Sequence, residues 1–267
     1  MPRARRAGVV LALCAAAVLG GACANDEETT PGGGGGTGGV GPEPVCTTPT
    51  AVACEDQVIL QMNLQPLAAP GLVTDTVDGD GFASVVDATA GGFNASPPDS
   101  YVYARFTPTG LVKVDLSDEA ALASMDWDIA FRRFVVRVNS GNSGPSCVSA
   151  ARLAGTPAYE SVTAVPDNLI YHEDDYFTAE PDCTLIADGT GMPGSPATAL
   201  SSYWTYPGCV KMTGNVFVVE RADGTHVKLT VTHYYNEASQ QLCQDTDAVP
   251  MSGTGSANIR LRWAFLP

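Results

Sequence analysis

Short runs in which apolar and polar residues alternate recur along the chain from about residue 57 to its end. Alternation combined with β-branched and aromatic residues predicts strands, because successive side chains of a strand point to opposite faces. The predicted strands cover residues 57–65, 82–88, 100–108, 110–116, 127–139, 215–222, 226–236 and 258–266. One short helix is predicted at 116–125, with Ser117 as its N-cap. The fold class is therefore all-β, with predominantly antiparallel sheets forming a sandwich or a barrel-like domain with long loops, the longest from about residue 144 to 214.

The strand predicted at 127–139 contains a change of phase. Apolar residues occupy odd positions up to Phe131 and even positions from Phe134 onward. Since side chains alternate along a strand, this change predicts a bulge or a sharp twist at Arg132-Arg133. The two Asn-Ser-Gly units at 139–144 tolerate left-handed backbone and predict a tight turn. Asp223-Gly224, between two predicted strands, is typical of a hairpin.

The first 45 residues have a different composition. Residues 1–22 join three arginines to an apolar run too short for a membrane span, which is the pattern of a secretory signal peptide. The run ends in LGGAC, which resembles a bacterial lipobox and makes Cys23 the expected lipidation site; an ordinary signal peptide cut near Ala24 is the alternative. Residues 23–45 are Gly-rich and predict a flexible tether. Residues 46–267 remain as a single β domain, and the protein is expected to be exported and anchored to the outer membrane, facing the periplasm or the cell exterior.

Charge and cysteine content limit the partners and the covalent structure. The chain has 29 acidic and 14 basic residues, a net charge of −15, which argues against nucleic acid and anionic lipid as partners. Six cysteines follow Cys23, namely Cys46, Cys54, Cys147, Cys183, Cys209 and Cys243. An even number in an exported chain predicts three disulfides. The pairing stays open, and Cys46 with Cys54 is the one local pair that we expect; a metal site is the alternative, although no CxxC occurs.

Catalytic motifs are missing from the sequence. It has no G-x-S-x-G nucleophile motif, no credible triad and no paired histidines for zinc, so no enzymatic activity is expected. Only three histidines occur, His172, His226 and His233. His226 and His233 are seven residues apart on one predicted strand, which separates them by roughly 23 Å and points them to opposite faces. A site with two histidines on one metal ion would therefore have to include His172.

Three segments together resemble the HmuY family of bacterial haem-binding lipoproteins. They are WDIAFRRFVVRVNSGNSG (127–144), NVFVVERADGTHVKLTVTHYYN (215–236) and NIRLRWAF (258–265), and they stand in the family's order. The resemblance implies an HmuY-like all-β domain on the outer membrane that takes up haem and passes it to an outer-membrane transporter, without performing chemistry on it. It also implies two axial iron ligands, usually His and in some members Met, on loops in the middle of the chain.

One of these ligand loops precedes the VFVV strand in the family, and here it is segment 202–214, which contains no histidine. The resemblance thus points to Tyr206 and Met212 as candidate ligands in this loop, with Trp204 as a residue that either stacks on the porphyrin or packs the sheet. The expected site has His172 and Tyr206 as iron ligands and Met212 and Trp204 as further cofactor contacts, with haem or a related porphyrin bound. For His172 the alternative is a solvated loop residue paired with a neighbouring carboxylate. For the whole domain the alternative is a cofactor-free β-sandwich module for adhesion or interaction at the cell surface.

Overall fold

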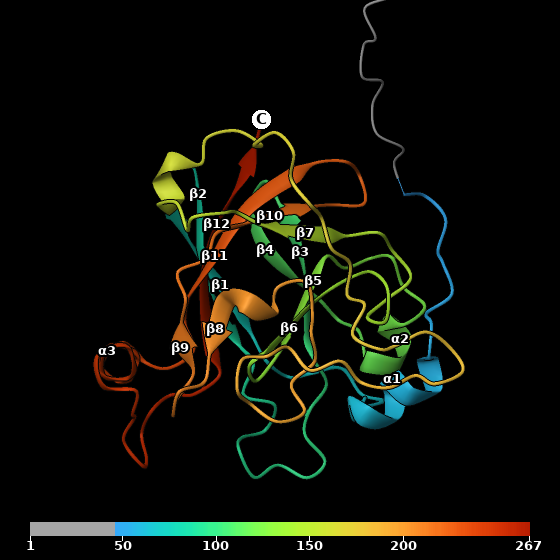
Figure 1. The fold of residues 1–267 in the computed structure, drawn as a ribbon, viewed down its shortest axis with the longest axis horizontal. Helices are drawn as coiled ribbons and strands as arrows, with labels where there is room; N and C mark the ends of the chain where they lie inside the picture. The colour runs from blue at the N-terminus through green and yellow to red at the C-terminus, as the bar shows by residue number, and fades with distance from the viewer. Residues whose placement is uncertain (1–45) are drawn as a thin grey trace, which may run out of the picture. The chain divides into compact units, whose positions relative to one another are not determined.

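The computed structural model of the protein describes residues 46–267 (Figure 1). The expected signal peptide at 1–22, the tether at 23–45 and the lipidation site Cys23 lie outside the described residues. Within residues 46–267, none of the helices combines the length and the apolar character needed to cross a membrane.

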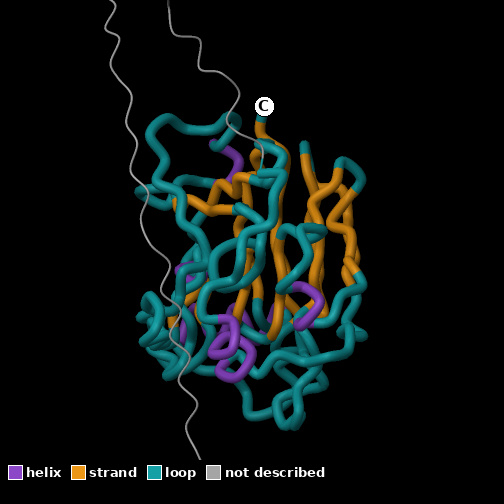
Figure 2. The backbone as a smooth tube through the Cα atoms, turned by 90° about the vertical axis from the view of Figure 1, so that its right-hand side faces the viewer, coloured by secondary structure: helices purple, strands orange, loops and turns teal. Residues whose placement is uncertain are grey.

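Most of the regular structure is antiparallel β-sheet, as the alternating pattern predicted (Figure 2). The larger sheet has six strands in the order β1 (Val73–Asp78), β2 (Gly81–Asp87), β12 (Asn258–Leu266), β11 (His226–His233), β10 (Phe217–Glu220) and β7 (Ser149–Arg152). The smaller sheet has four, in the order β4 (Gly110–Val114), β3 (Val102–Thr107), β5 (Ile129–Arg132) and β6 (Val135–Val138). All neighbouring strands in both sheets are antiparallel. The two sheets stay separate, so the sandwich is the architecture that forms.

The main hydrophobic core fills the space between the two sheets. Phe106 and Ile129 enter it from the four-stranded sheet, and Phe217, Leu229 and Trp263 enter it from the six-stranded sheet. Each of these side chains is at most 1% exposed. Burying a large apolar side chain contributes about 1.5–3 kcal/mol, so this shared core is the main reason why the two sheets stay together.

Both sheets are also covered on their outer faces. On the four-stranded sheet, Tyr103 and Ala130 pack with Trp127 and with residues of the helices α1 (Glu55–Gln61) and α2 (Asp118–Ala121). On the six-stranded sheet, Val216 and Val218 pack against residues 153–171, which we call the covering segment. Its only regular element is the short 3₁₀ helix η1 (Tyr159–Ser161). The covering segment therefore closes off a second, smaller hydrophobic cluster outside the sandwich.

The segment predicted as one bent strand at 127–139 is a hairpin instead. Strands β5 and β6 pair antiparallel with Arg132 opposite Val135, and Arg133 in the turn has a left-handed backbone (φ 54°). Pairing across this two-residue turn places Ile129 opposite Val138 and so joins an odd position to an even one. The change of phase in the sequence is the signature of this turn, and the expected bulge or twist is wrong.

The aspartate between Trp127 and β5 joins the two sheets. Asp128 is buried, and its Oδ2 accepts the Phe106 N–H of β3 at 2.9 Å and the Arg221 Nε–H at 3.1 Å. Arg221 follows β10 of the other sheet. Burial raises the pKa of Asp128, while the charge of Arg221 and the bond from Phe106 act against this rise.

Residues 57–65 were predicted as a strand, and this prediction is wrong, because helix α1 occupies Glu55–Gln61. Glu55 and Asp56 lie in its first turn, where negative charge stabilises a helix. Val58 is its only fully buried residue, whereas Leu60 is 71% exposed. The alternation V-I-L-Q-M therefore does not describe a half-buried strand.

Several other predictions are confirmed. Residues 258–266 form β12, Asp223-Gly224 lies in the β10–β11 turn, and the Ser117 side chain caps α2 by accepting the Ala120 N–H. The region 144–214 has only short elements, which are β7, η1, η2 (Ser201–Tyr203), β8 (Trp204–Thr205) and β9 (Lys211–Met212). Strands β1 and β7 and helix α3 (Glu237–Thr246) were not predicted from the sequence.

Candidate functional site

A cavity of about 970 Å³ lies under the covering segment at the β7 edge of the six-stranded sheet. Residues 152–172 supply most of its lining, and Ala199 and Ser202 complete it. Its volume is at the upper end of the range found for small-molecule sites. The covering segment contains proline and glycine, which disfavour a further full strand at this edge of the sheet.

The lining combines apolar residues with polar ones, which include Ser161, Thr163, Asn168 and Ser202. Leu153, Val162, Val165 and Leu169 line the cavity and also belong to the hydrophobic cluster between the covering segment and the sheet. Ile170 lines it too and is 74% exposed. Arg152 and Asp167 supply the charged groups of the lining. Apolar surface together with placed polar groups is the usual form of a small-molecule site.

Tyr159 anchors the covering segment to the outer face of the sheet. Its ring is buried, and the Lys228 ammonium and the Arg262 guanidinium each lie 4.5 Å from the ring centroid. Arg262 also forms ion pairs with Asp78 and Glu160. Burial raises the pKa of Tyr159 well above its ordinary value, so the ring stays neutral between the two cations.

His172 stands at the end of the covering segment, and its backbone continues the sheet for one residue beyond β7. Its N–H and C=O exchange hydrogen bonds of 3.0 Å with Ala150. The side chain is exposed and lines the cavity. Within residues 46–267 its ring has no hydrogen bond or ion pair, so the expected alternative of a pair with Glu173 or Asp174 does not form here.

Two residues further, Asp174 fixes the segment that carries His172. The Ala199 N–H donates to its Oδ1 at 2.8 Å, and the Val138 N–H donates to its Oδ2 at 2.9 Å. The Ser143 hydroxyl also donates to Oδ2, at 2.6 Å, while accepting the Arg137 Nε–H at 2.8 Å. Burial raises the pKa of Asp174 to about 6. This carboxyl therefore ties together β6, the Asn-Ser-Gly turn and the segment before η2.

The junction of the two Asn-Ser-Gly units, Gly141-Asn142, is more than a turn. Asn142 is buried, donates from Nδ2 to the Ala53 carbonyl at 2.9 Å and accepts the Phe177 N–H at Oδ1 at the same distance. Gly141 has a left-handed backbone (φ 53°), and a Cβ there would lie 2.8 Å from the Asp174 carbonyl oxygen. The sequence therefore needs Asn and Gly at these positions to hold residues 174–177 against the turn.

The other residues predicted for the site lie elsewhere. Trp204 is 1% exposed and Met212 is 8% exposed, both inside the main core. Tyr206 is half-buried against that core, with its ring edge-to-face on Trp204 at 6.3 Å. None of these three lines the cavity that His172 lines. The residues that sequence reasoning missed are the apolar lining and Arg152, and no sequence motif marks them.

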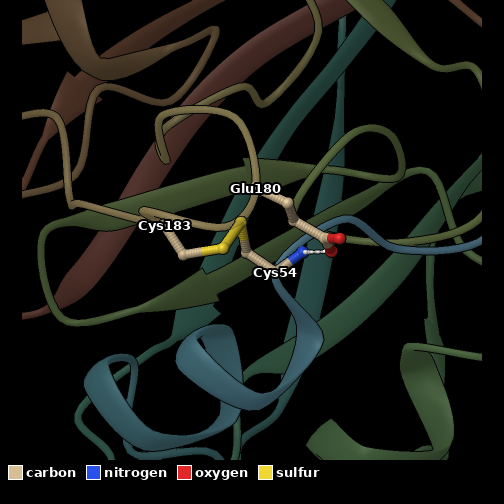
Figure 3. A group of neighbouring side chains, drawn as sticks. All are labelled: Cys54, Glu180 and Cys183. Atoms are coloured by element: carbon tan, nitrogen blue, oxygen red, sulfur yellow. Dashed lines mark hydrogen bonds between the residues drawn. A yellow bond between two sulfur atoms is a disulfide. The ribbon is translucent and has the colours of Figure 1, made fainter.

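The disulfides differ from the expected pairing. Cys54 is bonded to Cys183 and Cys209 to Cys243, so the expected local pair Cys46–Cys54 is wrong. Cys54 has a left-handed backbone, and its sulfur lies 3.5 Å from the Thr178 carbonyl oxygen in the 178–183 loop. Figure 3 shows Glu180 beside this bond, accepting the Cys54 N–H at 3.1 Å. These three residues lie within metal-binding distance of one another, but sulfurs joined in a disulfide offer no thiolate to a metal ion.

Comparison with known proteins identifies the family. The family model described as HmuY protein matches residues 98–244, which is more than half of the chain. No curated protein matches the chain.

Among solved structures, the chain is similar to a protein described as a lipoprotein from Bacteroides fragilis, with 15% identity, a TM-score of 0.43 and coverage of 70% of this chain and 93% of that one. It is also similar to a protein described as HmuY-like and heme-binding from Bacteroides vulgatus, with 17% identity, a TM-score of 0.42 and coverage of 69% and 91%. An apo HmuY analog from Tannerella forsythia has 15% identity, a TM-score of 0.38 and coverage of 73% and 97%. On the match of the family model, the chain belongs to the HmuY family.

Proposed function

We propose that the protein binds haem in the cavity beside His172, as an exported lipoprotein that delivers haem to an outer-membrane uptake system. The observation that carries the proposal is the unpartnered imidazole of His172 at the edge of a cavity of about 970 Å³ with a partly apolar lining. The chain belongs to the HmuY family, and the resemblance of its sequence to that family implies haem uptake. This supports haem as the ligand.

The residues of the cavity fit a haem in three respects. An imidazole nitrogen is a common axial ligand of haem iron, and the ring of His172 is not engaged by another described side chain. Leu153, Val162 and Leu169 offer apolar contacts to a porphyrin face. The exposed guanidinium of Arg152 is available to a propionate, because arginine pairs well with carboxylates.

The proposed site uses one protein ligand. Within the described lining, His172 is the only residue of a type that ligates haem iron, since no Met, Tyr or Cys lines the cavity. The proposed site therefore does not include Tyr206 or Met212. The haem would bring the iron, and the chain would supply one imidazole ligand and apolar contacts. Binding and transfer, rather than catalysis, is the function that such a site serves.

Titration of the purified domain with haemin tests the proposal. We expect a sharpened Soret band with a high-spin spectrum, because one imidazole leaves the sixth position to water or an added ligand. His172→Ala is expected to weaken binding at least tenfold. His233→Ala is the matched control, because His233 pairs with Glu237 and lies outside the cavity, so its loss leaves binding unchanged.

A free-haemin spectrum with micromolar wild-type protein rules out the proposal and leaves the cofactor-free interaction module. Equal affinity of wild type and His172→Ala would place the haem at another site.

The membrane anchor is tested separately, by labelling expressing cells with radioactive palmitate. We expect the wild-type chain to take up label, because the sequence before Cys23 resembles a lipobox. Cys23→Ala is expected to lose the label, and Cys14→Ala, which changes the other cysteine of the N-terminal segment, is expected to keep it. Label retained in Cys23→Ala would contradict the anchor.

A further inference from the structure

Two cysteines remain after the two disulfides are formed, and they lie side by side. Cys46 and Cys147 are unpaired in the described chain, and each is half-buried. The Ala222 carbonyl accepts the Cys46 N–H, and Ala222 lines the same small cavity as Cys147, although 100 residues separate the two cysteines in sequence. The fold, rather than nearness along the chain, therefore brings these two residues together.

The backbone on both sides fixes this contact. Residues 46–54, which we call the strap, run across the Asn-Ser-Gly turn and the residues that follow it. The Cys46 N–H donates to the Ala222 carbonyl at 3.0 Å. Thr50 donates to the Pro145 carbonyl from its N–H at 2.8 Å and from its hydroxyl at 3.1 Å. At the other end, the Ala53 carbonyl accepts the Asn142 side chain, and Cys54 is bonded to Cys183.

We propose that Cys46 and Cys147 form a third disulfide in the exported protein. The two thiols lose two protons and two electrons as the S–S bond forms. The electrons pass to the disulfide of a thiol–disulfide oxidoreductase, which is reduced to its dithiol by exchange through a mixed disulfide. With this bond, all six cysteines of residues 46–267 are paired.

A structural bond fits this position better than a reactive thiol. Burial raises the pKa of the Cys147 thiol to about 12, and the neighbouring Cys46 acts in the same direction. Since the thiolate is the nucleophile, Cys147 as a free thiol would react slowly with other molecules. An oxidising compartment supplies the oxidised oxidoreductase that converts such a neighbouring pair of thiols to the disulfide.

The bond gives the strap a covalent attachment at each end. Cys54–Cys183 holds it to the 178–183 loop, and Cys46–Cys147 holds its first residue to the segment leading into β7. A force applied through the chain before Cys46 would then act on a covalent bond to the domain, and not on the hydrogen bonds of Thr50. This inference is independent of haem binding.

Peptide mapping of the full chain, purified without reductant from an oxidising compartment, tests the proposal. After alkylation in denaturant, trypsin cuts at Arg137 and Arg152 and releases Cys147 in peptide 138–152. Thermolysin, which cuts before aliphatic residues, then separates Cys46 from Cys54. We expect the fragment that carries Cys147 to be linked to the fragment that carries Cys46, and no alkylated cysteine among the six.

Two results would overturn the proposal: alkylated Cys46 and Cys147 in the folded wild-type protein, or a Cys46–Cys54 link with Cys147 alkylated. A Cys46→Ser variant supplies a second measurement. We expect it to expose one thiol per chain on denaturation and to unfold at a lower urea concentration than the wild type, because a loop of about 100 residues is no longer closed. The matched control is Thr47→Ser, which changes the neighbouring residue of the strap and leaves both cysteines in place.

Discussion

Asp174→Ala is expected to lower the free energy of unfolding by about 3–5 kcal/mol. The substitution removes an acceptor from the N–H groups of Val138 and Ala199 and from the Ser143 hydroxyl. Asp174 is 0% exposed, so water does not replace the lost carboxyl without entering the interior. Each buried donor left without a partner costs about 1–3 kcal/mol, and the buried Arg137 loses its nearby anion.

Urea unfolding at pH 7.5, followed by the fluorescence of the buried tryptophans, measures this loss. Asp174→Asn should lose less, because its amide oxygen still accepts, although its NH₂ group faces a donor. Asp175→Ala is the matched control, since Asp175 is the exposed neighbour and its change should stay within about 0.5 kcal/mol. A loss below 1 kcal/mol for Asp174→Ala would contradict the role given to this carboxyl.

The same residue makes stability depend on pH with a defined sign. Its pKa in the folded protein is raised to about 6 from 3.8, so the folded state binds the proton more tightly than the unfolded state does. The resulting stabilisation is complete below about pH 4 and is lost as the pH rises through 6. We expect the difference in unfolding free energy between wild type and Asp174→Ala to shrink by about 2–3 kcal/mol from pH 4 to pH 7. A constant difference would contradict the raised pKa.

Replacing Cys54 and Cys183 together by serine is expected to cost about 3–5 kcal/mol. The bond joins residues 129 apart, and closing so long a loop restricts the unfolded chain strongly. It also holds the first residue before α1 against the 178–183 loop. Urea unfolding without reductant measures the loss.

The comparison variant is Cys209→Ser with Cys243→Ser. That bond joins residues 34 apart, so loop closure predicts a loss smaller by about 1 kcal/mol. A larger loss for the Cys209 and Cys243 pair would show that local packing around α3, rather than the length of the loop, determines the contribution of each bond.

The sheet was predictable wherever one face of a strand is buried. Residues 258–266 alternate between core residues such as Leu261 and outward residues such as Arg262, and the prediction of this strand holds to the residue. Strand β7 was missed because Ser149-Ala150-Ala151-Arg152 contains no β-branched or aromatic residue. Helix α3 did carry a signal, because Asn236 caps it by accepting the Ser239 N–H.

The candidate site was predictable only in part. His172 was singled out by its residue type and its place in the long irregular region, and it lines the cavity. The cavity itself is made by packing of the covering segment on Val216 and Val218, which lie more than 40 residues further along the chain. Neither periodicity nor spacing encodes such a contact. For the same reason Met212 and Trp204 lie inside the core, although their place in the loop before the VFVV strand led us to predict them as cofactor contacts.

The covering segment has a consequence for thermodynamic linkage. Its residues line the cavity, and two of them, Leu153 and Val162, also shield apolar atoms of the six-stranded sheet. Opening the cavity by lifting this segment would therefore hydrate the hydrophobic cluster beneath it. A ligand that occupies the closed cavity raises the free energy needed to lift the covering segment. Occupancy of the cavity and the melting temperature of the domain must therefore rise together.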